Sequence, residues 1–421
     1  DTMMVGTLGY TAIAAVGLTM QPRMILLILA QALCVGTTAI VSRRKGEGDQ
    51  KSANLCFGQS MLVVTIIGII MSLIGFFFPE EFMLLAGANE ETLEMAVTYF
   101  RIISSTLVFN YWSLCICAAM RAIGSTRITL VTNLTANLVN VVLNYALIGG
   151  HFGFPALGVR GAAIATATGT IIGCIIAFIV ALKKTGYLRL RLRNIFSFDK
   201  PTMKGLMTVG SSSMIETVCL RVGFLLTSRL IASLSTDAFA TYQIVSQVTM
   251  LTFTLGDGIA AAGASLVGQS LGAKRKDLAM ANVRISRRIS SVISVFLILL
   301  LLFFRRPFAS LFTDEISIIE NASIAFLVVA VAIFSQNGRV VYSGCLRGAG
   351  DVRFVALCSL ISVTILRPIL TWVLCYPLNA ALPFAHLAVT GPWIAFTIDA
   401  FIRDGLLIRR INKGKWMQIK L

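Results

Sequence analysis

The chain has 421 residues, of which 57% are hydrophobic and only 13% are charged, and its mean hydropathy is +0.84. Soluble domains carry roughly 45–50% apolar and about 25% charged residues, so this composition excludes an ordinary soluble protein and indicates a polytopic membrane protein. The net charge of +17 would suit a nucleic-acid-binding protein, but the basic residues lie in every second loop between apolar segments, which argues against nucleic acid as a partner.

Apolar segments long enough to span a bilayer recur along the whole chain. Spanning takes about 20 mainly apolar residues, and eleven full segments of this kind follow a shorter apolar stub at the beginning. The clearest examples of such apolar segments include residues 61–78 and 289–304. Because the chain starts at Asp1 and not at Met, we expect the stub to be the end of a first helix whose beginning is missing.

The loops alternate in charge, which is the positive-inside pattern. It predicts that the basic loops and the C-terminus face the cytoplasm and that the protein is a multi-pass protein of the plasma (inner) membrane. His151 and His386 fall in loops of the outer side, so a His-based catalytic or metal site is not expected. The nine cysteines lie mostly in apolar runs, which favours small buried side chains over disulfides. The basic segments are 42–51, 183–200, 273–288 and 409–420, and the acidic or neutral ones are 79–94, 233–237 and 313–321.

The chain also contains an internal repeat. The octapeptide MRAIGSTR at 120–127 recurs as LRGAGDVR at 346–353, and the offset of 226 residues that aligns the two also aligns Gly46 with Gly272. Each copy accounts for six spans, so both copies run in the same direction across the membrane, as in transporters built from parallel repeats. We therefore predict an all-α polytopic membrane protein with twelve transmembrane helices in two six-helix bundles. The predicted domains are an N-terminal bundle at 1–184 with an incomplete first helix, a basic cytoplasmic linker at 185–202 and a C-terminal bundle at 203–421.

Each octapeptide joins the fourth and fifth helices of its bundle. We interpret it as a cytoplasmic corner, in which glycine permits a tight turn and the arginines stay among lipid headgroups and water. A phosphate-binding loop is the alternative. Such a loop needs several glycines after a strand, and no strand precedes either copy.

Four asparagines in the fifth helix of the first bundle are spaced 4, 3 and 4 residues apart. They share one face of the helix because they lie within roughly 60° of one another. Polar groups inside a membrane need a partner or a wet cavity. The stripe therefore either lines the cavity of the first bundle or joins helices through amide hydrogen bonds. It consists of Asn133, Asn137, Asn140 and Asn144.

Glu216 lies inside an apolar segment of the second bundle, on one helical face with Ser212 and Ser213. An acidic side chain at the centre of a membrane helix costs about 2.5–3.5 kcal/mol on insertion scales. It is therefore either a functional carboxylate that binds a cation or one half of an ion pair with an arginine of another helix. Arg339 would neutralise Glu216, or else would repel or orient cationic substrates.

Other polar residues of the second bundle are further candidates. Asp257, near the cytoplasmic end of its helix, would bind a cation, or cap or pair locally. Arg367 and Asp399 look like a structural pair between the last two helices. The remaining candidates for substrate contact are Gln243 and Gln247, one turn apart, and Gln336, which shares a face with Arg339 and Ser343.

Several stretches of this sequence resemble the multidrug and toxic compound extrusion (MATE) family of transporters. LRGAGDVR and MRAIGSTR resemble its two corners, DTMMVGTLG resembles the end of its first helix, and LVGQSLGAKRKDLA resembles the loop after its eighth. The likeness covers essentially the whole chain, and the motifs come in the right order. It implies twelve helices in two bundles and the export of drug-like, often cationic, molecules against an inward flow of Na⁺ or H⁺.

The resemblance carries over to single residues only in part. Asp1 matches a carboxylate of the family's first helix, and Glu216 matches a glutamate that one branch has in the seventh. Asn140 and Asn144 match an Asn and Asp pair of another branch, with Asn in place of the Asp, and a helix-ten Asp of some members falls at Gln336. Two acidic groups for the coupling ion are thus absent. The resemblance leaves the ion as Na⁺ or H⁺, with Na⁺ expected at Asp1, Asn140, Asn144 or Glu216.

We therefore expect a secondary active transporter that exports small organic, cationic, drug-like molecules in exchange for Na⁺ or H⁺ by rocker-type alternating access. A flippase for a lipid-linked sugar or polyprenyl carrier is the alternative, because the intramembrane charges include arginines as well as Glu216 and Asp257. An enzyme would need clustered His, paired Asp or a nucleophile with a base, and none is expected. Beyond small organic substrates and the lipid bilayer we expect no cofactor and no nucleic acid, and we expect a monomer.

Overall fold

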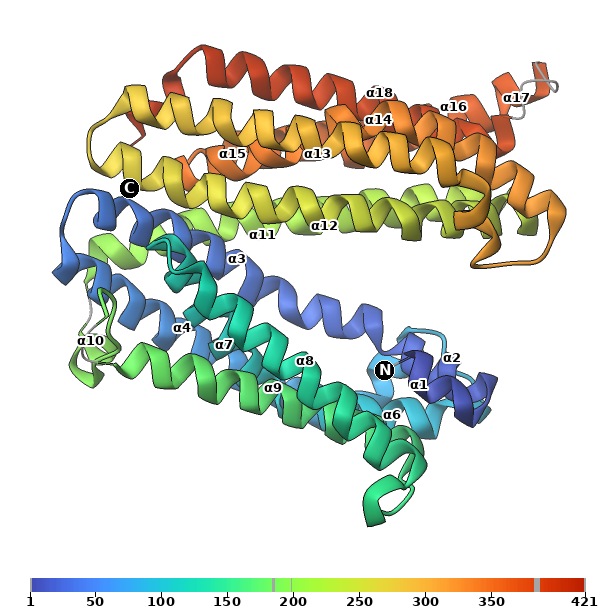
Figure 1. Ribbon diagram of the computed structural model, residues 1–421, viewed down its shortest axis with the longest axis horizontal. Helices are drawn as coiled ribbons and strands as arrows, with labels where there is room; N and C mark the ends of the chain where they lie inside the picture. The colour runs from blue at the N-terminus through green and yellow to red at the C-terminus, as the bar shows by residue number, and fades with distance from the viewer. Residues whose placement is uncertain (1, 184–185, 198, 382–386, 420–421) are drawn as a thin grey trace. The chain divides into compact units, whose positions relative to one another are not determined.

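The computed structural model describes residues 2–183, 186–197, 199–381 and 387–419, and all regular elements within these ranges are helical (Figure 1). The chain divides into two compact units, unit 1 at 1–210 and unit 2 at 211–421. The division falls inside helix α11 (Lys200–Ala232), whose first turns therefore belong to unit 1. The domain boundaries expected from the sequence stay predictions.

Unit 1 packs its helices around an apolar core that includes the fully buried Phe57 and Tyr111. Polar residues begin some of its helices: the Asp49 carboxylate accepts the backbone N–H of Ser52 at 3.0 Å and so caps α4. Hydrogen bonds from the side chain and backbone of Ser52 hold the pKa of Asp49 below its usual value. The elements of unit 1 before α11 are α1 (Thr2–Val5), η1 (Gly6–Leu8), α2 (Tyr10–Leu18), α3 (Met20–Gly46), α4 (Gln50–Phe77), α5 (Pro79–Leu85), α6 (Glu90–Ser105), α7 (Leu107–Ala122), α8 (Thr126–Gly149), η2 (His151–Gly153), α9 (Gly158–Leu182) and α10 (Leu192–Phe196).

Unit 2 is organised around α14, which packs against α12, α13 and α18. Between α14 and α18, the α-helical conformation gives way to a π-helical segment, η3, just before Pro368. Proline has no backbone N–H to donate to a helix, and a π-helical turn accommodates such a break. The elements of unit 2 after α11 are α12 (Thr236–Gly272), α13 (Lys276–Ser310), α14 (Ile316–Ala349), α15 (Val352–Ser359), η3 (Leu360–Leu366), α16 (Arg367–Cys375), α17 (Pro377–Ala381), α18 (Leu387–Asn412) and η5 (Lys415–Gln418).

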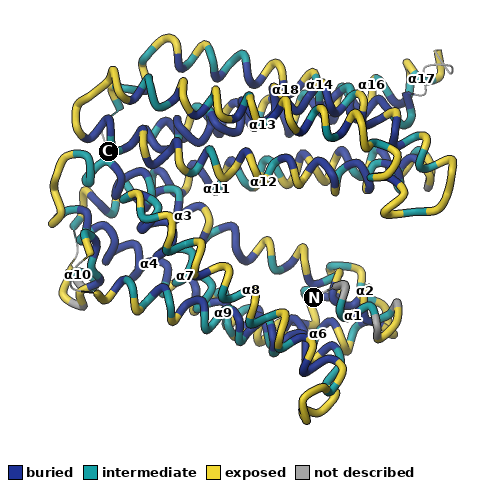
Figure 2. The backbone as a smooth tube through the Cα atoms, in the orientation of Figure 1, coloured by how far each residue is buried: buried dark blue, intermediate teal, exposed yellow. Residues whose placement is uncertain are grey.

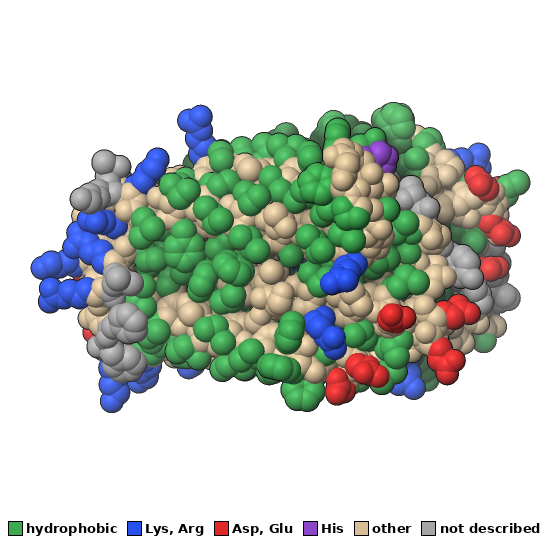
Figure 3. Space-filling view, turned by 90° about the horizontal axis from the view of Figure 1, so that it is seen from below, with side chains coloured by type: hydrophobic (Ala, Val, Ile, Leu, Met, Phe, Trp, Pro, Cys, Tyr) green, Lys and Arg blue, Asp and Glu red, His purple; other side chains and the backbone are tan. Residues whose placement is uncertain are grey.

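Eight helices of the described residues are long and apolar enough to cross a membrane, and the count is nine if α6 and α7, bent by 49° at their break, are taken as one span. Large hydrophobic side chains such as Leu138 and Phe303 are exposed. Figure 2 shows where exposed and buried stretches follow one another along helices such as α8. On the face drawn in Figure 3, hydrophobic side chains cover the middle, while Lys and Arg gather at one end and most Asp and Glu at the other. All nine cysteines are free thiols, and eight of them are buried. The chain is thus an all-helical, multi-pass membrane protein, and the count of twelve helices stays a prediction.

Helix boundaries repeat with the same offset as the sequence motifs. Helix α4 begins at Gln50 and α13 at Lys276, and α8 begins at Thr126 and α15 at Val352. Both pairs are 226 residues apart. The offset that aligned the octapeptides therefore also aligns the starts of the helices that follow equivalent loops.

Both octapeptide corners turn through a glycine in the left-handed region of backbone conformation. Gly124, between α7 and α8, has φ of +89°, and Gly350, between α14 and α15, has φ of +90°. A residue with a Cβ adopts such angles at a cost. The tight turn expected at each corner is confirmed.

Candidate substrate-binding site

Unit 2 contains a cavity of about 280 Å³ among α11, α12, α14, α16 and α18. Apolar side chains such as Leu220, Phe224 and Phe253 form part of its lining. Charged side chains form much of the rest, which is unusual for a cavity within helices of such apolar composition. The charged residues in the lining are Glu216, Arg221, Asp257, Arg339, Arg347, Arg367 and Arg403.

Glu216, on α11, is only 3% exposed and is bound by an arginine of the second octapeptide. Arg347 Nη2 donates to Oε1 of Glu216 at 2.7 Å, and Arg347 Nε donates to Oε2 at 3.1 Å. The hydroxyl of Ser359 adds a third hydrogen bond, to Oε1 at 3.3 Å. The expectation that the corner arginines stay among lipid headgroups is therefore wrong for Arg347. A bidentate pair between a guanidinium and a carboxylate is among the strongest hydrogen-bonded arrangements in proteins.

The rest of the second octapeptide fixes the end of α14 against its neighbours. Gly348 lies against the backbone of Ala264 on α12, where an added Cβ would have no room. Asp351 accepts hydrogen bonds from Nε and Nη2 of Arg410, on α18, at 2.7 and 3.2 Å. The corner therefore holds α14 to α12 and α18 and so sets the position from which Arg347 reaches Glu216.

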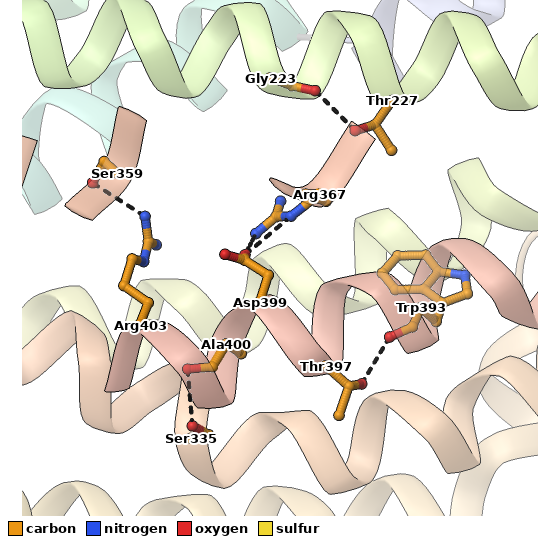
Figure 4. A network of polar contacts seen from close by, with 10 residues as sticks. All are labelled: Gly223, Thr227, Ser335, Ser359, Arg367, Trp393, Thr397, Asp399, Ala400 and Arg403. Atoms are coloured by element: carbon orange, nitrogen blue, oxygen red, sulfur yellow. Dashed lines mark hydrogen bonds and ion pairs between the residues drawn. The ribbon is translucent and has the colours of Figure 1, made fainter. Parts of the chain in front are cut away.

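Two further arginines of the lining are held by polar partners (Figure 4). Arg367 of α16 and Asp399 of α18 form a buried ion pair, so the structural pair expected from the sequence is confirmed. Arg403 of α18 donates to the hydroxyl oxygen of Ser359 at 3.1 Å. Since Ser359 in turn donates to Glu216, these contacts join α18, α15 and α11 in one network.

Arg339, on α14, lines the cavity and is only 5% exposed. Its guanidinium carbon lies 5.4 Å from the ring centroid of Phe253, and its buried Nε makes no hydrogen bond. None of the ion pairs among the described residues includes it. Of the two roles considered for Arg339, neutralising Glu216 is wrong, because Arg347 occupies both carboxylate oxygens.

Arg221 and Asp257 line the same cavity with exposed side chains. No described ion pair includes either of them. Their charged groups are therefore available to a molecule bound in the cavity.

The glutamines singled out in unit 2 lie apart from the cavity lining. Gln336 is fully buried on α14, and within the described part of the chain its amide oxygen and nitrogen have no hydrogen-bond partner. Gln243 and Gln247 are exposed on α12. The structure thus brings Glu216 and Asp257 together with Arg339, and it leaves the three glutamines outside this group. Their contact with a substrate stays a prediction.

In unit 1, two asparagines of the stripe form a hydrogen-bonded chain. Asn140 Nδ2 donates to the hydroxyl of Thr166, on α9, at 2.9 Å, and Asn144 Nδ2 donates to Oδ1 of Asn140 at 3.2 Å. Asn137 is exposed. Asp1 and His386 lie outside the described residues.

The arrangement in unit 2 has the chemistry of binding. Its groups are charges that pair with one another or with a ligand, set among aromatic and aliphatic side chains. Among the described residues no group of three His, Cys, Asp or Glu side chains is placed to hold a metal ion. Sequence reasoning missed Arg347, Ser359 and Arg403 as members of the site. The one available signal was the arginine at the second position of both octapeptides, Arg121 and Arg347.

Comparison with known proteins gives one consistent family. The MatE family model matches residues 1–146 and 213–373. The transporter YisQ of Bacillus subtilis is 27% identical over 423 residues, which cover 99% of this chain and 90% of YisQ. The probable multidrug resistance protein NorM of Thermotoga maritima is 25% identical over 417 residues, which cover 99% of this chain and 88% of NorM. A crystal structure of MATE in the bent conformation has the same fold, with a TM-score of 0.89 at 21% identity over 99% of this chain and 91% of that one.

Proposed function

Because the chain belongs to the MatE family of membrane transporters, we propose that it exports small organic, drug-like molecules in exchange for Na⁺ or H⁺. The multidrug resistance protein among the relatives supports this over a flippase for a lipid-linked sugar or polyprenyl carrier. The observation that carries the proposal is the pair of Glu216 and Arg347, a buried carboxylate held by a single arginine at the wall of a cavity.

The pair offers a physical means of coupling. A proton or Na⁺ that binds the Glu216 carboxylate competes with Arg347 for the same oxygens. With the pair formed, α11 is joined to the last turns of α14, and with the pair broken this link is lost. Exchange by rocker-type alternating access requires that ion and substrate favour opposite states of the transporter. We propose that the substrate favours the paired state and the ion favours the broken one.

The positive charge expected of the substrate follows from the family resemblance, and Glu216 would bind it only with a free carboxylate. In the structure Arg347 and Ser359 occupy both of its oxygens, so a cation has to displace a bidentate guanidinium to bind there. We therefore propose small organic molecules as substrates without requiring a positive charge.

A Na⁺ ion has a second candidate site in unit 1. Asn140 and Asn144 place amide groups one turn apart on α8, and amide and carboxylate oxygens are ligands of hard cations. Asp1, the carboxylate that the family resemblance assigns to the first helix, lies outside the described residues. Glu216 and this second site make different predictions for the same variants.

The test is transport by the full-length protein in liposomes with Na⁺ and proton gradients imposed separately. Two bicyclic aromatic probes of opposite charge, naphthalene-1-sulfonate and N-methylquinolinium, report on export. We expect one gradient to drive at least one probe, and Glu216→Gln to remove that dependence. If neither gradient moves either probe, the proposal is wrong. If Glu216→Gln keeps the dependence and Asn140→Leu loses it, the coupling ion binds in unit 1.

A further inference from the structure

The charges that line the cavity of unit 2 do not balance. Five arginines face two carboxylates, Glu216 and Asp257. Asp399 is the ion-pair partner of Arg367. With Asp399 included, the number of carboxylates rises only to three. Positive charge is therefore in excess at a place where apolar helices offer little water to solvate it.

The excess is concentrated at Arg339. Arg347 and Arg367 each have a carboxylate partner, and Arg403 has the hydroxyl of Ser359. Arg339, in contrast, lies over the face of the Phe253 ring, and among the residues that the structure describes its buried Nε has no hydrogen-bond partner. A buried cation with no counter-charge is strongly unfavourable, and the unsatisfied Nε–H of Arg339 favours an acceptor that comes from outside the protein.

We propose that the cavity of unit 2 binds the anionic group of the exported molecule, a carboxylate or sulfonate, at Arg339, with Arg221 as a second contact. This assignment rests on the proposed function for the direction of transport. Arg221 lines the same cavity and has no ion pair among the described residues. Two guanidinium groups bind a carboxylate or sulfonate through charge-assisted hydrogen bonds.

The apolar part of the lining favours an aromatic body on such an anion. Phe253 lies beneath Arg339, and Phe224 lies beneath Arg367, with 5.4 and 5.2 Å between guanidinium carbon and ring centroid. A flat ring system with an acidic substituent can contact these aromatic side chains while its anion meets the guanidinium. The Glu216–Arg347 pair stays intact with such a ligand, so anion binding agrees with a substrate that favours the paired state.

Equilibrium dialysis of the purified full-length protein against the two probes tests the assignment directly. Naphthalene-1-sulfonate and N-methylquinolinium are similar in size and shape and differ in the sign of their charge. We expect the anion to bind wild-type protein at least about tenfold more tightly, a difference that charge-assisted hydrogen bonds are strong enough to supply. Equal affinity, or a preference for the cation, would show the assignment to be wrong whatever any variant does.

Variants then locate the anion. Arg339→Met keeps the length of the side chain and removes its charge, and we expect it to weaken naphthalene-1-sulfonate binding about tenfold, whereas Arg339→Lys keeps most of the affinity. Arg353→Met is the matched control, since Arg353 is an exposed arginine of the same unit outside the lining, and it leaves binding unchanged. Melting temperature and gel filtration establish that each variant is folded. A folded Arg339→Met variant that binds the anion with wild-type affinity contradicts the assignment.

If Arg339→Met does not fold, Arg221→Met, at an exposed side chain, takes its place. We expect this variant to bind naphthalene-1-sulfonate at least about threefold more weakly, and wild-type affinity contradicts the assignment.

An anionic lipid headgroup presents the same chemistry as an anionic solute. Binding of naphthalene-1-sulfonate is therefore compared in nanodiscs of phosphatidylcholine with and without phosphatidylglycerol. Unchanged affinity supports a soluble anion, whereas displacement of the probe by phosphatidylglycerol identifies a lipid site and overturns the assignment.

Transport in liposomes separates this inference from the proposed function. If the anion binds through Arg339 but no ion gradient moves it, the anion site is supported and the proposal of ion-coupled export is contradicted for this class of molecule. If a gradient drives N-methylquinolinium while the anion does not bind, ion-coupled export stands and the anion site fails.

Discussion

The interiors of the two units differ in the kind of polar contact that joins their helices. The contacts between helices shown for the described part of unit 1 include neutral ones: Asn140 donates to Thr166, and the Trp112 indole donates to Thr65 at 2.8 Å. Unit 2 has neutral contacts as well, such as that from Asn337 to Ser294, but among its described residues it adds ionic ones. The ion pairs of unit 2 that join different helices are Glu216–Arg347, Asp351–Arg410, Arg367–Asp399 and Arg287–Asp404.

The difference is informative because α4 and α13, and likewise α8 and α15, begin 226 residues apart, the offset of the sequence repeat. The position in unit 2 that corresponds to Asn133 is Ser359, 226 residues later. Asn133 is exposed on α8, whereas Ser359 is buried and bridges Glu216 and Arg403. Equivalent positions of the sequence repeat thus differ in their burial and in their polar contacts. A neutral amide contact changes little with ions or charged ligands, while an ion pair can be broken by either. The comparison assigns ion and charge sensitivity to unit 2.

The largest expected effect is at the buried pair of Arg367 and Asp399. Arg367→Met leaves the fully buried Asp399 without its counter-charge, and we expect a loss of about 3–5 kcal/mol in the free energy of unfolding. Chemical unfolding in detergent, followed by circular dichroism, measures it.

The matched control removes both charges. Arg367→Met combined with Asp399→Leu leaves no charge unpaired, so most of the lost stability is expected to return. A double variant as unstable as the single one would mean that packing, and not the charge pair, holds α16 to α18.

The second effect is on transport and concerns Glu216. Glu216→Gln keeps the shape of the side chain and removes its charge, so we expect ion-driven export to fall at least about tenfold, the factor that loss of one charge-assisted hydrogen bond can produce. Binding of naphthalene-1-sulfonate is expected to persist, because Arg339 and Arg221 are unchanged. The ion dependence of export by wild type, Glu216→Gln and Arg347→Met measures the effect. Export by Arg347→Met with normal ion dependence would separate coupling from the ion pair.

Much of the fold was predictable from the sequence, because apolar length, loop charge and the repeat are local or periodic signals. The ion pair of Arg367 and Asp399 was predictable in kind, because two opposite charges in neighbouring apolar helices have few other partners. Arg347 was not, since 131 residues separate it from Glu216 and no period links a corner residue to the middle of another helix. The sequence also contains no sign that Asn140 turns toward Thr166 while Asn137 stays exposed, because helical spacing places both on one face. Such contacts depend on how helices are rotated against one another.

A third effect tests whether the two corners are equivalent as turns. Gly350→Ala and Gly124→Ala both place a Cβ at a residue with φ near +90°, and we expect each to reduce the free energy of unfolding by about 1 kcal/mol. Only Gly350→Ala is expected to reduce export as well, because the unit 2 corner carries Arg347. Unfolding and export measured on both variants decide this. Equal loss of export in the two would mean that the corners act alike.

The smallest effect is at Asn140, where the neutral character of unit 1 is tested. Asn140→Leu removes the hydrogen bond to Thr166 and the acceptor for Asn144, both between uncharged groups. Such contacts between membrane helices contribute about 0.6 kcal/mol on average, so we expect a small loss of stability and an unchanged response of export to ions. The matched variant is Asn137→Leu, on the same helix with an exposed side chain, which leaves stability unchanged and reduces export only if the stripe lines a cavity. Unfolding and gradient-driven export are measured for both variants in parallel. If Asn140→Leu removes the ion dependence of export while the protein stays folded, then the coupling ion binds at the asparagines, and ion sensitivity belongs to unit 1 as well. In that case the neutral contacts between α8 and α9 belong to an ion-binding site, and the assignment of ion sensitivity to unit 2 is wrong.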